Sequence, residues 1–295
     1  MRRERLIIYI LLLLLFSYCK CGSERSNSEG KKEADKRSLD IKMFDRNKEV
    51  QKMVFETRFS DVARRFGDVI FEQKYTLEIS SEKQKLELSN TDLLEHAKNG
   101  DYHIKVENSA GKMLEAYYID GKLYVSMDGK RFFLHADDLV EARARKESVY
   151  AQANSFLKTY SDFIKFVYDG DEERDGVRFL RFKTELSSEN SKKEVGRTFN
   201  LEEISGHVLI DNRSGGIVGV DLRGKIKYQK DAKIAISKFF IKSSIKKSQK
   251  PLTFRIPELG AEPQKLRIEK DLLQRLEKME EKIETEKEED SEISE

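Results

Sequence analysis

Two cysteines, Cys19 and Cys21, are the residues of this chain best placed for a covalent modification. Both lie just behind a basic start and an unbroken apolar run from Leu6 to Phe16. This run is shorter than the ~20 apolar residues that cross a membrane, and with a basic start it is typical of a secretory signal. The sequence therefore predicts an exported protein. Because it has no further cysteine, its body has neither a disulfide framework nor a cysteine-based metal site.

The stretch from Met1 to Cys21 resembles a bacterial lipoprotein signal peptide, whose lipobox cysteine becomes the lipidated first residue of the mature protein. Phe16 and Ser17 suit the upstream positions of such a box, although Tyr18 is larger than the residue that usually precedes the cysteine. The resemblance implies a signal peptide over 1–18 and a lipid anchor at Cys19, with Cys21 as the alternative anchor. An uncleaved signal anchor, or cleavage that leaves both thiols unmodified, is the competing interpretation.

The segment behind the cysteines favours an anchor. Gly22 to Ser38 contains no large apolar residue, so it cannot bury enough surface to fold. We expect residues 19–41 to form a flexible tether that holds a folded body away from a membrane. Two or three acyl chains on one cysteine anchor a protein stably, whereas one chain gives only marginal binding.

Few other residues are spaced for chemistry. The acidic stretch from Asp169 to Gly176 has the carboxylates of a calcium loop, but Arg174 stands where glycine is needed and Leu180 where the bidentate glutamate is needed. We expect a loop between a helix and a strand there. The four histidines, His96, His103, His135 and His207, show no ligand spacing, and no glycine loop for phosphate is present. The sequence predicts no enzyme, no cofactor and no metal.

Basic residues are concentrated late in the chain. The run comprises Arg223, Lys225, Lys227, Lys230, Lys233, Lys238, Lys242, Lys246, Lys247 and Lys250. It is typical of a solvated sheet face whose lysines protect an edge strand, and contact with anionic headgroups or lipopolysaccharide phosphates is the alternative. A nucleic-acid partner is not expected in an exported protein without a recognition motif.

The body, expected over residues 42–263, alternates helical and strand patterns. Period 3.6 predicts helices over 43–66 and 137–167, and period 2 predicts strands at 69–79, 86–94, 102–106, 113–119, 177–186, 204–210, 217–228, 233–245 and 252–256. Asp120-Gly121 and Asp128-Gly129 separate apolar strands and predict tight type I′ hairpins, because both turn residues need positive φ. The helices interrupt the strand series rather than alternating with it. This order predicts an α+β fold with a single curved antiparallel sheet of about 9–11 strands and helices packed on its concave face.

The meander YYIDGKLYVSMDGKRFFL, the long helix after it and the late pair HVLIDNRSGGIVGVDL are similar to the LolA/LolB family and the related LppX–LprG lipoproteins. The resemblance implies a half-open barrel whose concave face, covered by helices, holds acyl chains. It concerns architecture only, and no functional residue of the family is carried over.

Aromatic residues of the predicted helix and strands are the candidates for a cavity that holds acyl chains. They are Phe71, Tyr75, Tyr118, Tyr124, Phe133, Phe156, Tyr160 and Phe163. A sixteen-carbon chain such as palmitate would gain roughly 12 kcal/mol there before costs, at ~0.8 kcal/mol for each methylene. The alternative is that these side chains fill an ordinary core between helix and sheet.

The chain ends in a charged segment, 264–295, in which Leu272, Leu276, Met279 and Ile283 form a short helical seam before glutamate-rich sequence that we expect to be disordered. Taken together, the sequence predicts a lipid-anchored protein of the bacterial cell envelope, in the outer membrane, that binds acyl chains or carries lipids or lipoproteins. A structural or surface-interaction lipoprotein with a self-filled core is the alternative.

Overall fold

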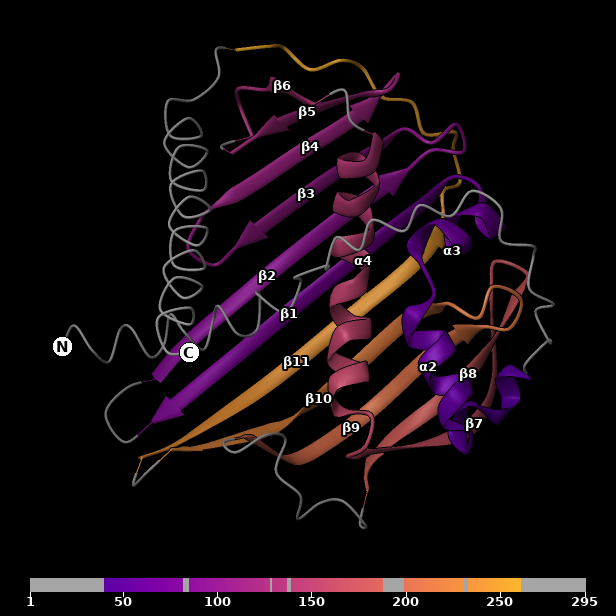
Figure 1. Ribbon diagram of the computed structural model, residues 1–295, viewed down its shortest axis with the longest axis vertical. Coiled ribbons are helices and arrows are strands. Elements are labelled where there is room, and N and C mark those ends of the chain that lie inside the picture. Colours follow the sequence, from indigo (N-terminus) through magenta and orange to yellow (C-terminus); the bar gives the residue numbers. More distant parts are fainter. Residues whose placement is uncertain are drawn as a thin grey trace, which may run out of the picture.

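The computed structural model describes residues 40–81, 85–127, 129–136, 139–187, 199–230 and 233–260. Over these ranges the chain forms one eleven-stranded antiparallel sheet, curved but not closed, with its helices on the concave face (Figure 1). The predicted α+β class and the number of strands are confirmed.

Eleven strands and four helical segments make up the described part of the chain. The helical segments are the 3-10 helix η1 (Ile41–Asp45), α2 (Lys48–Glu56), α3 (Phe59–Phe66) and α4 (Leu139–Tyr160). The strands are β1 (Val69–Ser81), β2 (Lys85–His96), β3 (Tyr102–Asn108), β4 (Met113–Ile119), β5 (Lys122–Ser126), β6 (Phe133–Ala136), β7 (Ile164–Arg174), β8 (Val177–Leu186), β9 (Phe199–Asp211), β10 (Ile217–Lys230) and β11 (Lys233–Lys247).

The sheet consists of two meanders that meet at its centre. Its strand order is β6-β5-β4-β3-β2-β1-β11-β10-β9-β8-β7, so the first strand pairs with the last. This central pair is regular along its length, with Phe71 opposite Ile245 and Leu77 opposite Phe239. Helix α4 connects the meanders and crosses the sheet in front of its central strands (Figure 1).

The predicted hairpin at Asp120-Gly121 is confirmed. Asp120 has a φ of 50° and Gly121 a φ of 83°, the left-handed conformation that both central residues of a type I′ turn require. Asp175 and Gly176 make a second turn of this kind between β7 and β8, with φ values of 51° and 70°. The expected helix-to-strand loop at 169–176 is therefore wrong, because most of this stretch belongs to strand β7.

The single helix predicted over 43–66 is also wrong, because the chain breaks it at Thr57. Helix α2 ends there, with an extended backbone (ψ 131°), and α3 begins at Phe59. The break lets the two short helices cover different parts of the curved sheet. Val54 of α2 packs in one buried cluster and Val62 of α3 in another.

Two further boundaries differ from the prediction. The long helix ends at Tyr160 rather than at Val167, and Ile164 and Phe166 are the inward-facing residues of β7. The predicted short strand over 252–256 is absent from the described residues, in which this segment has no regular secondary structure. Pro251 and Pro257 flank it, and neither has an N–H to give to a sheet.

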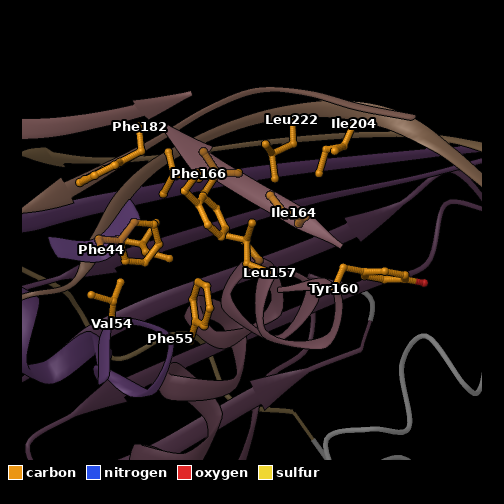
Figure 2. Close-up of a cluster of buried hydrophobic side chains, with 14 of the residues drawn as sticks. Phe44, Val54, Phe55, Leu157, Tyr160, Ile164, Phe166, Phe182, Ile204 and Leu222 are labelled. Atoms are coloured by element: carbon orange, nitrogen blue, oxygen red, sulfur yellow. The ribbon is translucent and has the colours of Figure 1, made fainter. Parts of the chain in front are cut away.

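Two buried clusters fill the space between the helices and the sheet. The α2-side cluster lies beneath α2 and the C-terminal half of α4, and includes Phe44, Val54, Phe55, Leu157, Phe166, Phe182 and Leu222 (Figure 2). The Phe44 ring centroid lies 4.7 Å from that of Phe166 and 4.9 Å from that of Phe182. The α3-side cluster lies beneath α3 and the N-terminal half of α4, and includes Phe59, Val62, Leu94, Tyr102, Leu123 and Tyr150.

A smaller outer cluster lies on the opposite face of the sheet. It consists of Ile119, Tyr124 and Phe132, with Tyr117 and Phe254 packed against them. Phe254 belongs to the segment after β11, and Gly260 of that segment donates its N–H to the carbonyl of Phe132 over 2.7 Å. The end of the described chain thus covers part of the outer face.

Candidate functional site

The eight aromatic residues predicted to line a cavity do not form one wall. Seven of them lie on the helix-covered face of the sheet, in two groups. Tyr75, Phe156, Tyr160 and Phe163 belong to the α2-side cluster or pack against it, and Phe71, Tyr118 and Phe133 do the same in the α3-side cluster.

Tyr124 is the residue that the structure places elsewhere. Its neighbours on β5, Leu123 and Val125, pack beneath the helices, so the alternation of strand side chains turns Tyr124 to the other face, where it joins the outer cluster. Phe163 lies beyond the end of α4, in the turn before β7, yet it remains buried at 7% exposure. The continuous helical stripe expected from sequence therefore stops at Tyr160.

Partly buried apolar side chains lie on the helix-covered face beside the C-terminal half of α4. Tyr75, Leu77, Phe156 and Leu186 are only partly buried there, and all four pack against the α2-side cluster. The Phe156 ring centroid lies 4.8 Å from those of Tyr160 and Phe239. We call these four residues the apolar margin. Burial raises the pKa of the neighbouring Tyr160 to about 12, so this hydroxyl is neutral at physiological pH.

A polar layer lies under the middle of α4. The Gln73 side-chain amide donates to Asp92 Oδ2 over 3.0 Å, to Gln152 Oε1 over 3.3 Å and to the Val149 carbonyl over 3.4 Å. Asn90 donates to Asp92 Oδ1 over 2.7 Å. Asp92 is fully buried, and its burial raises the pKa of its carboxyl to about 6 against the lowering effect of the Gln73 hydrogen bond.

Sequence reasoning missed this layer, although the strand pattern contained a signal for it. Gln73 stands between Phe71 and Tyr75 on β1, and Asp92 stands between Asn90 and Leu94 on β2. Both are polar residues at positions that alternation turns toward the helices. Because buried polar groups need partners, two such residues on neighbouring strands predict a hydrogen-bonded pair.

Helix α4 packs on the sheet through apolar contacts and also makes a few hydrogen bonds to it. The Tyr102 hydroxyl donates to the Ala142 carbonyl over 2.7 Å, and the Tyr150 hydroxyl donates to the Ile217 carbonyl over 2.9 Å. Lys146 Nζ lies 3.2 Å from His96 Nε2, and burial together with the Lys146 charge lowers the pKa of His96 to about 4. His96 is therefore neutral, and its Nε2 accepts a hydrogen bond from the Lys146 ammonium group.

Two surface hollows of the described structure are lined by residues other than the predicted aromatic ones. The larger, about 680 Å³, spans strands β1 and β8–β11, and the smaller, about 340 Å³, lies near Lys42, Arg65 and Arg213. None of the eight predicted aromatic side chains lines either hollow. Among the eight, the Phe156 ring contacts that of Tyr160, and the Phe71 and Tyr118 rings contact those of Tyr150 and Tyr102 in the α3-side cluster.

The remaining candidates for chemistry are engaged with other side chains. His103 lies between Glu95 and Glu115, 2.8 Å from a carboxylate oxygen of each. The carboxylates of the acidic stretch pair with arginines, Asp171 with Arg178 and Asp169 with Arg181. Among the described residues, no group of three histidine, cysteine, aspartate or glutamate side chains is arranged to hold a metal ion.

The predicted signal peptide, the tether up to residue 39 and the charged tail lie outside the described residues, as do Cys19 and Cys21. No helix within the described ranges has the length and apolar character needed to span a membrane.

No protein-family model and no curated protein matches this chain. Solved structures do resemble it. A LolA superfamily protein from Nitrosomonas europaea is similar over 69% of this chain and 94% of its own, at 10% identity and a TM-score of 0.23. The lipoprotein LppX from Mycobacterium tuberculosis is similar over 70% of this chain and 98% of its own, at 10% identity and a TM-score of 0.28.

A chain of the MucA/MucB complex from Pseudomonas aeruginosa is similar over 66% of this chain and 57% of its own, at 11% identity and a TM-score of 0.24. The LolA and LppX proteins carry the names of the families to which the sequence shows a resemblance. At these identities and TM-scores, however, the likenesses carry over no ligand, partner or activity.

Proposed function

We propose that this protein is a non-enzymatic envelope lipoprotein that binds an acyl chain of a lipid or lipoprotein at the apolar margin. The observation that carries the proposal is the margin itself. Tyr75, Leu77, Phe156 and Leu186 leave apolar surface only partly covered, next to a helix that crosses the sheet. An acyl chain laid along this surface gains about 0.8 kcal/mol for each methylene removed from water.

Helix α4 is the element that would move to lengthen this surface. It is a single helix that lies over the polar layer formed by Gln73 and Asp92. Its attachment to the sheet consists of side-chain packing and a few hydrogen bonds, and no second sheet covers it in the described structure. Lifting its C-terminal half exposes the apolar residues beneath Leu157 while the sheet stays intact. The Tyr160 ring combines an apolar body with a polar hydroxyl, which suits the mouth of such a site.

Lipid extraction and native mass spectrometry of the purified full-length chain test this proposal, together with titration of a fluorescent fatty acid. We expect a co-purified lipid or a saturable fatty-acid signal. Phe156→Glu introduces a carboxylate at a partly exposed position of the margin, so the fold survives and fatty-acid binding weakens by at least about tenfold. The matched control is Val140→Glu, which adds the same charge at the other end of α4, where the side chain is 74% exposed. Fatty-acid affinity unchanged in Phe156→Glu would refute the margin as the binding site.

A second candidate is a structural or surface-interaction lipoprotein whose half-barrel is filled by its own side chains. The packing favours this reading within the described residues, because the Phe44, Phe166 and Phe182 rings contact one another directly. Absence of any lipid signal from the unsubstituted protein would exclude the carrier and leave this second candidate.

We further propose that a lipidated Cys19, or Cys21 in its place, holds the protein at the outer membrane after export. The support is the sequence of the signal, the cysteines and the polar tether behind them. Membrane lipids are then the first partner of the chain, and lipoproteins are a possible cargo.

A further inference from the structure

The outer face of the sheet carries two ordered rows of side chains across its central strands. Strand register places Thr76 of β1, Phe240 of β11, Arg223 of β10 and Ser205 of β9 in one row. The next row consists of Glu78, Lys238, Lys225 and Glu203, in the same strand order. These positions alternate with the core residues Leu77, Phe239 and Ile204, so their side chains point away from the helices.

These two rows line the 680 Å³ hollow, which also includes Gly224, Glu202 and three residues of the helix-covered side, Leu186, Ile204 and Phe239. The sheet is irregular at this place. Between the pairs Lys225–Glu203 and Ile226–Leu201 the register shifts, and Glu202 is the extra residue. A Cβ on Gly224 would lie 2.0 Å from the Glu203 carbonyl oxygen, so only glycine permits so close an approach of β9 and β10. The hollow is thus built by the backbone and by side chains from separate strands.

Some of the charges in the hollow are already neutralised within the protein. Lys225 pairs with Glu203, and Glu78 has Lys85 at 3.7 Å. Arg223 reaches only the Ser205 hydroxyl, at 3.4 Å, and neither Arg223 nor Lys238 has a carboxylate partner among the described residues. Glu202 likewise makes no ion pair within the described ranges. Among the described residues, Arg223, Lys238 and Glu202 therefore make no ion pair, although Glu78 stands opposite Lys238 on the neighbouring strand.

Protection of a sheet edge does not explain these cations. Strands β10 and β11 lie inside the sheet, each paired on both sides, whereas the edges are β6 and β7. The sequence-based interpretation of this basic run as edge-protecting lysines is therefore wrong for Arg223 and Lys238. Their side chains instead flank an aromatic ring, Phe240, and two hydroxyl groups, of Thr76 and Ser205.

We propose that this hollow binds a phosphate ester that also carries an ammonium group, as phosphoethanolamine does. Arg223 and Lys238 would take the phosphate through charge-assisted hydrogen bonds, with Thr76 and Ser205 as further donors. Glu202 would accept the ammonium, and Phe240 would contact the carbon atoms between the two charges. Most of the lining lies on the outer face, but Leu186 of the apolar margin also borders the hollow, so the test uses soluble probes that carry no acyl chain.

The test uses the full-length chain with two soluble probes, phosphoethanolamine and glycerol 3-phosphate, by calorimetric titration. Arg223→Gln combined with Lys238→Gln removes both cations that make no ion pair. The affinity for both probes should fall by at least about tenfold. Glu202→Gln should lower the affinity for phosphoethanolamine by roughly threefold, and the affinity for glycerol 3-phosphate should stay the same or rise. The control combines Lys98→Gln with Lys112→Gln, two exposed lysines outside the hollow, and removes the same charge.

Vesicles with and without phosphatidylethanolamine then identify the source of the ligand. Binding to both the vesicles and soluble phosphoethanolamine supports the site and identifies a membrane headgroup, whereas binding of the soluble probe alone supports the site and identifies a soluble ester. If neither probe binds the unsubstituted protein, or if the control loses as much affinity as the Arg223 and Lys238 double variant, the proposal is wrong.

Discussion

Replacing the buried carboxyl of Asp92 by an amide should stabilise the protein at neutral pH. Asp92 is fully buried between the sheet and α4, and this burial raises the pKa of its carboxyl from 3.8 to about 6. Above that pH the folded protein holds a carboxylate away from water with hydrogen bonds from Gln73 and Asn90 only. Asp92→Asn keeps the shape of the side chain and removes the charge.

The magnitude follows from the two pKa values. Since the folded state binds the proton more tightly than the unfolded chain, Asp92 favours folding below pH 4, and this contribution is lost as the pH rises from about 4 to about 6. Each pH unit between the two pKa values corresponds to about 1.4 kcal/mol. The ionised carboxyl therefore lowers the free energy of unfolding by ~3 kcal/mol at pH 7.

In Asp92→Asn we expect the free energy of unfolding at pH 7 to rise by up to ~3 kcal/mol. In the unsubstituted protein, ionisation of Asp92 lowers the free energy of unfolding between pH 4 and pH 6, and this decrease should be absent from the variant. The new amide needs an acceptor. Rotation of the Gln73 amide supplies its Oε1 but gives up the hydrogen bonds to Gln152 Oε1 and the Val149 carbonyl, which makes ~3 kcal/mol an upper limit.

Urea denaturation followed by circular dichroism, at several pH values from 4 to 7, measures both effects. The control is Glu87→Gln, which removes a carboxylate at an exposed position of the same strand and should leave the profile unchanged. A variant that is less stable than the unsubstituted protein at pH 7, or that keeps its full pH dependence, would refute the argument. In that event the carboxylate would be well solvated by its amide partners.

Two other substitutions test separate parts of the structure. Glu147 of α4 accepts hydrogen bonds from the N–H groups of Phe59 and Ser60, at 2.6 and 3.1 Å, and so caps α3, whose own N-cap residue Arg58 makes no side-chain cap. Glu147→Ala should lower the free energy of unfolding by about 1–2 kcal/mol in thermal denaturation, and an unchanged melting temperature would contradict this role. Cys19→Ala should abolish labelling by radioactive palmitate in a bacterial host. Labelling that persists in this variant would assign the anchor to Cys21, and no labelling of the unsubstituted protein would remove the anchor.

Local patterns predicted most of the elements, because turns and strands depend on neighbouring residues. The Asp120-Gly121 hairpin can be predicted from two residues that tolerate positive φ. The strand Val177–Leu186 can be predicted from its alternation of apolar and polar residues. The end of the long helix was missed for a related reason. Phe163, Ile164 and Val167 fit a helical stripe, but Ile164 and Phe166 also alternate with Lys165, and pairing with β8 decides between the two patterns.

The candidate sites depend on contacts that no local pattern contains. Tyr124 is an aromatic residue on a strand, and only the packing of Leu123 and Val125 beneath the helices shows that it faces the other way. Arg223 and Thr76 are far apart in the sequence and meet because β1, β11 and β10 are neighbours in a fixed register. The basic run was visible in the sequence, but its position in the interior of the sheet was not.

The pairing of the first strand with the last has a consequence for how the chain is made. Strand β1 is synthesised early, yet from Val69 to Ser81 one side of it stays unpaired until β11 is made. The first meander therefore carries a row of open N–H and C=O groups along β1 until nearly the whole body has emerged, a ready template for pairing with a second copy. Translation that stops before Lys233 would leave this edge open for good. A nascent or truncated chain is thus the form of this protein most exposed to aggregation, and a chaperone that covers β1 until β11 is made would prevent such pairing.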